Sequence, residues 1–209
     1  MKVISGVSIL LLAAGVTGCE SSDDTTDPVV SQPVDDVAAL NIVSRFDVDD
    51  DGWLIEGDAQ GGSASPTHEP ALADASAHIT ADDNATGGTW YFSAPSKFTG
   101  DLIDFYAGTL AFELKTTSIA RLLEEPDVIL NSGELEISTG IPMPPEMLFT
   151  PYSLPLTEAN RVDADGESID VNTFTAVLMN LERLRIRGEY NIGADSGGLD
   201  NVVLSIAGQ

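Results

Sequence analysis

The stretch that decides the fold covers residues 90–115 and reads WYFSAPSKFTGDLIDFYAGTLAFELK. Trp90 and Phe92 fall on one face of an extended chain, and so do Phe112 and Leu114 in the last run. Alternation with a period of two indicates β-strands that bury one face. A proline and two glycines lie between the runs and mark turns. The stretch therefore predicts two strands joined by a turn-rich connection.

The same alternation recurs later in the chain, in LRIRGEY (residues 184–190) and NVVLSIA (residues 201–207). Short alternating runs separated by Gly, Pro, Asn and Asp are typical of two packed antiparallel sheets. We therefore expect residues 41–209 to form an all-β, jelly-roll-like antiparallel β-sandwich. About 170 residues are enough for one domain with a full core.

One segment has a helical period instead. In VNTFTAVLMNLERL, which begins at Val171, apolar residues recur with the i, i+3, i+4 spacing of one helical face. This spacing predicts one amphipathic helix near residues 172–183. Asn172 or Thr173 is the expected N-cap, because a short polar side chain there can bond a free backbone N–H.

Residues 1–18 are expected to be a lipoprotein signal peptide. Lys2 precedes an apolar run that is too short to span a membrane as a helix. The run ends in VTGC, which resembles a bacterial lipobox and predicts that Cys19 is lipidated. The alternative is an ordinary secretory signal with an unrelated cysteine. Cys19 is the only cysteine in the chain, so no internal disulfide can form.

Residues 19–40 are polar, acidic and proline-containing, which predicts a disordered tether. Glu20 follows Cys19, and by resemblance to the Gram-negative sorting pattern this favours the outer membrane. We expect a cell-envelope lipoprotein whose only membrane contact is its lipid anchor, on either the periplasmic or the surface face.

The charge of the chain limits its partners. It has 34 acidic and 9 basic residues, a formal net charge of −25. Such an excess of negative charge repels nucleic acid, which we exclude as a partner. The acidity is spread along the chain, as on a hydrated extracellular surface.

Several of these strings also resemble one known family. WYFSAPSKFTGD followed by YAGTLAFELK is similar to the signature stretch of the laminin IV type A domain, also called the laminin B domain. YSLPLTE, VLMNLERLRIRGEY, LDNVVLS and the leading FDVDDDGW resemble further segments of bacterial members, in the same order. The resemblance extends from Phe46 to Ser205. It implies a jelly-roll-like β-sandwich akin to carbohydrate-binding modules.

The chain departs from the family in two places. Position 107 is Ala where the family usually has Gly, and EPALADASAHITADDN is a looser version of a glycine-rich entry to a strand. These departures concern loop geometry. In animals the domain is inserted among cysteine-rich repeats, whereas here it would stand alone, so the polymer and receptor roles of laminin do not carry over.

The string FDVDDDGW raises the question of calcium. Asp47, Asp49, Asp51 and Gly52 match positions 1, 3, 5 and 6 of a calcium loop, and Asp58 falls at position 12. An EF-hand needs a helix after the loop, however, and the following WLIEGDAQGG is too rich in glycine. We therefore do not expect a helix–loop–helix site.

A structural Ca²⁺ is the one cofactor that the sequence suggests. In jelly-roll carbohydrate modules such an ion commonly ties the first strand to the last. The resemblance thus implies a pair of ligands, Asp47 after the first strand and Asp200 at the opening of the last. The alternative is a solvated acidic turn.

Arg185, Arg187 and Glu189 share one face of a predicted strand. Tyr91 falls on the face of its strand that does not point to the core. These four residues could bind sugar hydroxyls or an acidic glycan. The alternative, which we favour, is a ladder of cross-strand ion pairs with Glu113 and other acids.

No catalytic motif stands out. His68 and His78 lack zinc-ligand spacing, and the chain has no G-x-S-x-G elbow. We expect a non-enzymatic, lipid-anchored binding module whose ligand is a glycan or a cell-surface or extracellular protein. The alternatives are a small polysaccharide hydrolase or lyase on a jelly-roll scaffold and a purely structural envelope lipoprotein.

Overall fold

The computed structural model describes residues 40–57, 64–73, 75–83 and 88–208. The predicted signal peptide, Cys19, nearly all of the tether and Asp58 lie outside the described residues. Within the described part, no helix is both long enough and apolar enough to cross a membrane.

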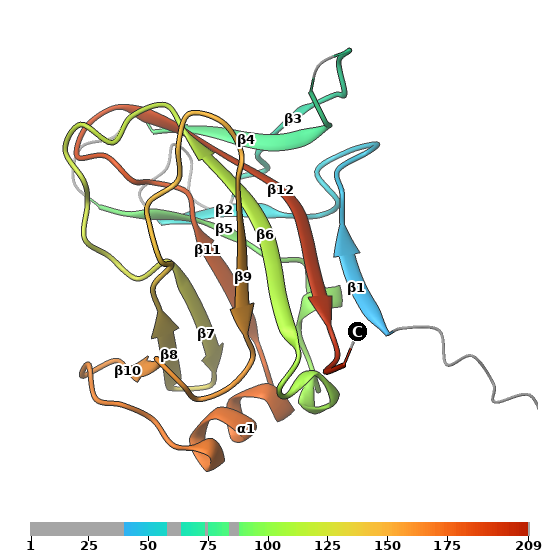
Figure 1. The fold of residues 1–209 in the computed structure, drawn as a ribbon, viewed down its shortest axis with the longest axis vertical. Coiled ribbons are helices and arrows are strands. Elements are labelled where there is room, and N and C mark those ends of the chain that lie inside the picture. Colours follow the sequence, from blue (N-terminus) through green and yellow to red (C-terminus); the bar gives the residue numbers. More distant parts are fainter. Residues whose placement is uncertain (1–39, 58–63, 74, 84–87, 209) are drawn as a thin grey trace, which may run out of the picture. The chain divides into compact units, whose positions relative to one another are not determined.

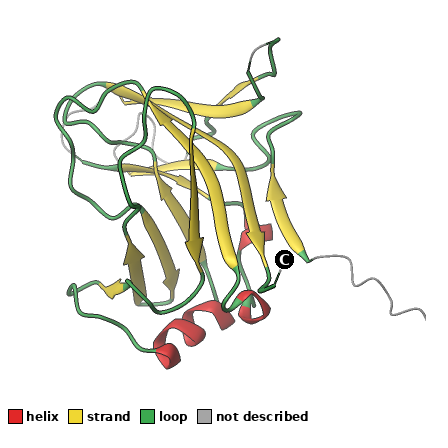
Figure 2. Cartoon of the chain, in the orientation of Figure 1, coloured by secondary structure: helices red, strands yellow, loops and turns green. Residues whose placement is uncertain are grey.

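The described chain folds into two antiparallel sheets (Figures 1 and 2). Sheet A has the order β3-β4-β12-β6-β9, with β1 also paired to β12. Its strands are β1 (Asn41–Ser44), β3 (Thr67–Glu69), β4 (His78–Asp83), β6 (Thr109–Thr116), β9 (Thr150–Pro155) and β12 (Asp195–Ser205). Sheet B has the order β10-β8-β7-β11-β5-β2. Its strands are β2 (Leu54–Gly57), β5 (Trp90–Ser93), β7 (Val128–Ser132), β8 (Leu135–Thr139), β10 (Val162–Asp163) and β11 (Arg183–Arg187).

The core lies between the sheets and is built by the alternation seen in the sequence. Trp90 and Phe92 of β5 are fully buried, and Phe112 and Leu114 of β6 are 1% exposed. Trp90 and Phe92 meet edge to face with ring centres 5.0 Å apart. Because successive residues of a strand point to opposite faces, every second residue of β6 stays partly accessible outside the core. The predicted all-β sandwich is confirmed.

The last strand is longer than predicted and connects much of sheet A. Its first half pairs with β4 and its second half with β1, while β6 runs along its other side. A bulge interrupts the β6 pairing between Asp200 and Val203, and Asn201 there has a φ of 49°. Asp200 therefore lies in the middle of β12 and does not open it. At the far edge of sheet A, β9 carries Pro151 and Pro155.

The described residues include one α-helix, as predicted, but its ends differ. Helix α1 spans Val171–Met179, and its N-cap is Asp170, whose carboxylate accepts a hydrogen bond of 2.8 Å from the Thr173 N–H. The helix stops at Met179 because Leu181 pairs with Gly100 in an isolated bridge. Helix α1 packs near β7 and the 3₁₀ turn η2 (Ile103–Phe105), at the bottom in Figure 1. A second 3₁₀ turn, η1, spans Ser96–Phe98.

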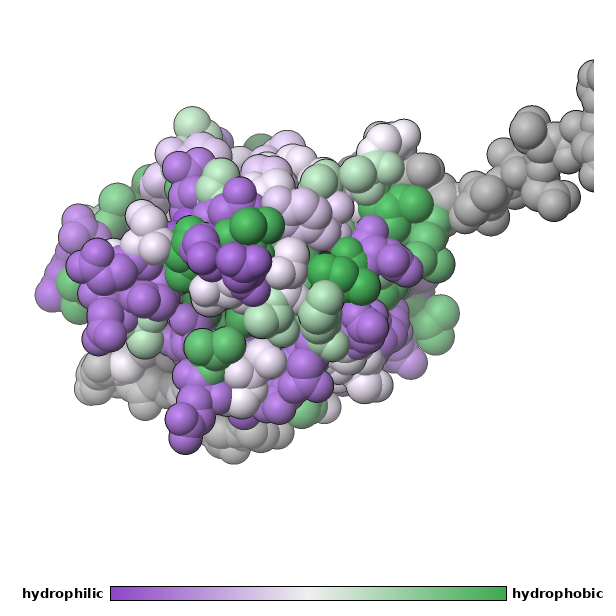
Figure 3. Space-filling view, turned by 90° about the horizontal axis from the view of Figure 1, so that it is seen from below, coloured by the Kyte–Doolittle hydropathy of each residue, from purple (hydrophilic) through white to green (hydrophobic). Residues whose placement is uncertain are grey.

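Figure 3 shows this end of the molecule from below, with apolar side chains in small groups among polar ones.

Candidate functional site

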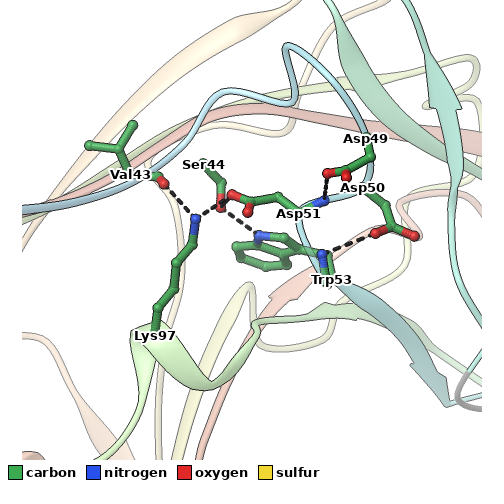
Figure 4. Close-up of polar contacts among 8 residues, drawn as sticks. Val43, Ser44, Asp49, Asp50, Asp51, Trp53 and Lys97 are labelled. Carbon is green, nitrogen blue, oxygen red and sulfur yellow. Dashed lines mark hydrogen bonds and ion pairs between the residues drawn. The ribbon is translucent and has the colours of Figure 1, made fainter.

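The acidic loop after β1 uses its carboxylates on the chain itself (Figure 4). Asp49 accepts a hydrogen bond of 2.9 Å from the Asp51 N–H, and Asp50 accepts one of 3.0 Å from the Gly52 N–H. Such bonds between an Asp side chain and the backbone two residues on fix tight turns. The segment that follows, β2, is a strand. A strand therefore stands directly after the loop, where an EF-hand would begin its exit helix.

Asp51 is at the centre of a small polar cluster in Figure 4. It forms an ion pair with Lys97, whose ammonium also donates to the Val43 carbonyl at 2.6 Å. The Ser44 hydroxyl donates to Asp51 and accepts from the buried Trp53 indole N–H. The cluster therefore ties the loop to β1 and to η1 with a lysine, where an EF-hand loop would use a metal ion.

The two predicted calcium ligands lie in different environments. Ser44 pairs with Val202, so the strand register brings the chain after β1 toward Asp200, as an ion shared by the first and last strands would require. Asp200 is fully buried and accepts hydrogen bonds from the Ser76 hydroxyl and the Asn201 N–H, whereas Asp47 is exposed. Burial raises the pKa of Asp200, and these donors oppose the rise. Among the described residues, no group of three or more His, Cys, Asp or Glu side chains is arranged to hold a metal.

Calcium binding by Asp47 and Asp200 stays a prediction with a direct test. If the ion is bound, excess calcium should raise the melting temperature above that in chelator by about 5–10 °C, the effect of a ligand at 100 times its Kd on a domain of this size. The D47N variant should lose this difference. Coincident melting curves of the wild-type chain in calcium and in chelator would show that the acidic turn is merely solvated.

The predicted ligand face of β11 is largely occupied by ion pairs. Arg185 lies 2.9 Å from Glu136 of β8, and Arg187 lies 2.7 Å from Asp127, the residue just before β7. Both arginines are therefore paired with acids, as the ladder interpretation expects, but neither acid lies on a strand next to β11. Glu136 is on β8, with β7 in between, and Asp127 lies just before β7. The partner named from the sequence, Glu113, is wrong, because Glu113 belongs to sheet A and pairs in register with Asp200.

Burial further limits this face. Tyr91, Arg187 and Glu189 are 7%, 5% and 4% exposed, and Glu189 accepts a hydrogen bond of 3.3 Å from the Trp90 N–H. Burial raises the pKa of Tyr91 to about 12. Arg187 also donates to the Leu123 carbonyl, from the segment between β6 and β7. Tyr91 is therefore not an open stacking platform, and Arg185 is the most accessible of the four predicted residues.

A groove of about 530 Å³ lies on the opposite sheet, over the outward faces of β3, β4, β12 and β6. Gly198 of β12 pairs with Lys115 of β6 on one side and with Thr80 of β4 on the other. A Cβ atom at Gly198 would come within 2.5 Å of Lys115 Cε, so the lysine side chain crosses the strand where the glycine leaves room. The polar lining includes Thr67, Glu69, His78, Thr80, Asp82 and Ser196.

Lys115 and His78 form the chemical centre of this groove. Their Nζ and Nε2 atoms are 2.7 Å apart, and His78 Nδ1 lies 2.9 Å from the Ser76 carbonyl. The carbonyl can only accept, so Nδ1 carries the proton and Nε2 accepts from the ammonium. The Lys115 ammonium also lies 4.8 Å from the centre of the Phe149 ring. Burial lowers the pKa of Lys115, and the charges of Glu69 and Asp200 oppose this.

Sequence reasoning missed this site. Alternation placed Lys115 on the outward face of its strand, but His78 lies 37 residues earlier in an irregular stretch. Only the position of β12 between β4 and β6 brings the two side chains together. The sequence did contain one sign of this site, the two adjacent glycines of GGLD in β12. Glycine in the interior of a strand often marks a place where another part of the protein lies close to the backbone.

The fold and groove define a class: a small antiparallel β-sandwich that presents a polar groove on one sheet. The family model described as Laminin B (Domain IV) matches residues 91–209, more than half of the chain. The chain therefore belongs to the Laminin B (Domain IV) family.

Similar proteins agree with this assignment. Human laminin subunit gamma-1 is 28% identical over 175 residues, covering 81% of this chain and 10% of that protein. Horse laminin subunit gamma-2 is 28% identical over 177 residues, covering 81% of this chain and 14% of the other. The chain thus spans between a tenth and a seventh of the length of these relatives.

One solved laminin domain shows the same fold. The L4b domain of human laminin alpha-2 has a TM-score of 0.65 at 14% identity and covers 82% of this chain and 99% of that domain. A family 11 carbohydrate-binding module from a cellulosomal cellulase of Clostridium thermocellum reaches a TM-score of 0.44 at 13% identity, covering 83% of this chain and 91% of the other.

Proposed function

We propose that the chain is a non-catalytic binding module of the cell envelope and that its ligand is a glycan bound in the groove over sheet A. The groove around Lys115 carries this proposal. It combines an ammonium, an imidazole, several hydroxyls and a nearby aromatic ring, the mixture of donors, acceptors and apolar surface that a sugar ring requires. A protein ligand on the cell surface is the second candidate.

The spacing of the groove acids supports binding over hydrolysis. Glu69 pairs in register with His78, and Asp82 lies four residues further along β4. Four residues of a strand correspond to about 13 Å. Glycoside hydrolysis needs two carboxyl groups about 5–9.5 Å apart. The two groove carboxylates are therefore poorly spaced for it.

The sequence pattern around Cys19 supports the proposed location. Lipidation there would hold the domain at the outer membrane, with the acidic tether between the lipid and the sandwich. Metabolic labelling with a fatty acid, compared between the wild-type chain and C19A, tests this part of the proposal independently of any ligand.

Replacing Lys115 by methionine is expected to weaken glycan binding at least about tenfold, because it removes a charge-assisted donor while keeping the length of the side chain. The measurement is a glycan panel with residues 20–209, followed by titration of any glycan that binds. R183M removes one positive charge from the other sheet, where Arg183 is exposed, and should bind like the wild type.

The same panel separates the alternatives. Loss of binding in R185M but not in K115M would place the ligand on the ion-paired face of sheet B. Turnover of a polysaccharide would identify an enzyme, and no binding to any glycan would leave a protein ligand or a structural role.

A further inference from the structure

Arg161, immediately before β10, is a buried cation that forms no ion pair with a carboxylate in the described part of the chain. It is 2% exposed. Its Nε and Nη2 atoms donate to the carbonyls of Thr157 and Pro155 at 2.7 and 2.9 Å. The guanidinium carbon lies 4.9 Å from the centre of the Phe174 ring. Nη1 has no hydrogen-bond partner among the described residues.

This arrangement is energetically unfavourable, although the chain has many acidic residues that could pair with an arginine. Burying a charge without an opposite charge carries a large desolvation penalty, and Arg185 and Arg187 avoid it through Glu136 and Asp127. Burial lowers the pKa of Arg161 to about 10, so the group still carries its charge at neutral pH. With 34 acidic residues in the chain, a buried arginine without one beside it is unexpected.

Arg161 also lines a pocket of about 400 Å³ where the edge strand β9 meets the end of β8 and the approach to β10. Ser153 and Asn160 supply exposed hydroxyl and amide groups there. Ile141, Pro142 and Leu154 supply short apolar walls. The pocket is therefore lined by one basic residue, neutral polar groups and apolar surface, within the volume of a small molecule.

We propose that this pocket binds a small hydroxylated ligand through a single carboxylate held by Arg161, as in a uronic acid. A planar guanidinium matches a planar carboxylate, and neutral donors such as Ser153 and Asn160 suit hydroxyl groups. A polyanion or a phosphate dianion would meet more repulsion from a chain of net charge −25. The site is separate from the groove at Lys115, so it does not depend on the function proposed for that groove.

The test is a titration of the full chain with D-glucuronate, with D-glucose as the uncharged match, while the Arg161 Nε–H signal is followed by NMR. Glucuronate should bind and shift this signal, and glucose should do neither. R161M should weaken glucuronate binding at least about tenfold, the loss expected for a charge-assisted pair.

A second variant keeps the test valid if R161M folds poorly, since Arg161 also bonds two carbonyls. N160D adds a negative charge at the pocket and leaves the Arg161 side chain itself unchanged. Asp tolerates the positive φ of 59° at this position. It should also weaken binding. N41D makes the same change on exposed Asn41 of β1 and should bind normally.

The remaining outcomes would overturn the proposal. These are no binding of glucuronate, equal binding of glucose, or N160D and N41D with equal affinity. Binding of inorganic phosphate or sulfate in place of glucuronate, lost in R161M, would show that the oxyanion is not a carboxylate.

Discussion

Replacing Asp127 by alanine is expected to destabilise the domain by about 3–5 kcal/mol, because it leaves a buried guanidinium without its counter-charge. The Arg187 and Asp127 side chains are 6% and 9% exposed. Asp127 Oδ2 also accepts a hydrogen bond of 2.8 Å from the Ile141 N–H, so the carboxylate links β11 to the loop after β8. The measurement is the free energy of unfolding by urea.

A neighbouring pair of the same ladder provides the control. Glu136, which pairs with Arg185, has a side chain that is 38% exposed, so E136A should cost less than about 1 kcal/mol. The double variant D127L/R187M removes both charges together and should recover much of the stability lost in D127A. Equal losses in D127A and E136A would mean that burial does not strengthen the inner pair.

Replacing Gly188 by alanine is expected to cost about 3 kcal/mol or more, because the new methyl group has no space. A Cβ atom at this position would overlap the Trp90 ring at Cζ3 and Cη2, and Trp90 is fully buried between the sheets. The ring cannot move away without displacing Phe92, with which it packs edge to face. Urea unfolding followed by tryptophan fluorescence measures the loss.

The matched change is G198A in β12. There the added methyl group meets the Cγ, Cδ and Cε atoms of the Lys115 side chain, which is flexible and partly exposed. We expect a loss of stability below about 1 kcal/mol, together with weaker ligand binding in the sheet A groove as Lys115 is displaced. If G188A were as mild as G198A, the packing of Trp90 against the strand would be looser than the structure describes.

The strands of the core could be predicted from the sequence because each has one face in the core. Trp90, Phe92, Phe112 and Leu114 are buried as their alternation indicates. Helix α1 was found by its spacing, but its cap was not. Asp170 lies outside the apolar period, and only the structure shows that its carboxylate accepts from the Thr173 N–H.

What covers the outer face of a sheet could not be predicted. Alternation correctly placed Tyr91 and Arg187 away from the core, yet both are buried. A strand pattern reports which residues share a face, but not whether another segment packs on that face. Here the connection between β6 and β7 contributes Leu123, whose carbonyl accepts from Arg187. The acids that pair with Arg185 and Arg187 could not be predicted for a similar reason, since they depend on the order of the strands in sheet B.

The edge strand β9 has a consequence for how this domain can meet other molecules. Proline has no backbone N–H, so Pro151 and Pro155 cannot donate to a strand laid alongside them. Extension of sheet A by a second copy or by an extended peptide is therefore discouraged at this edge. Recognition on this side of the sandwich then depends on side chains, and crowded copies of the domain are hindered from joining into a continuous sheet.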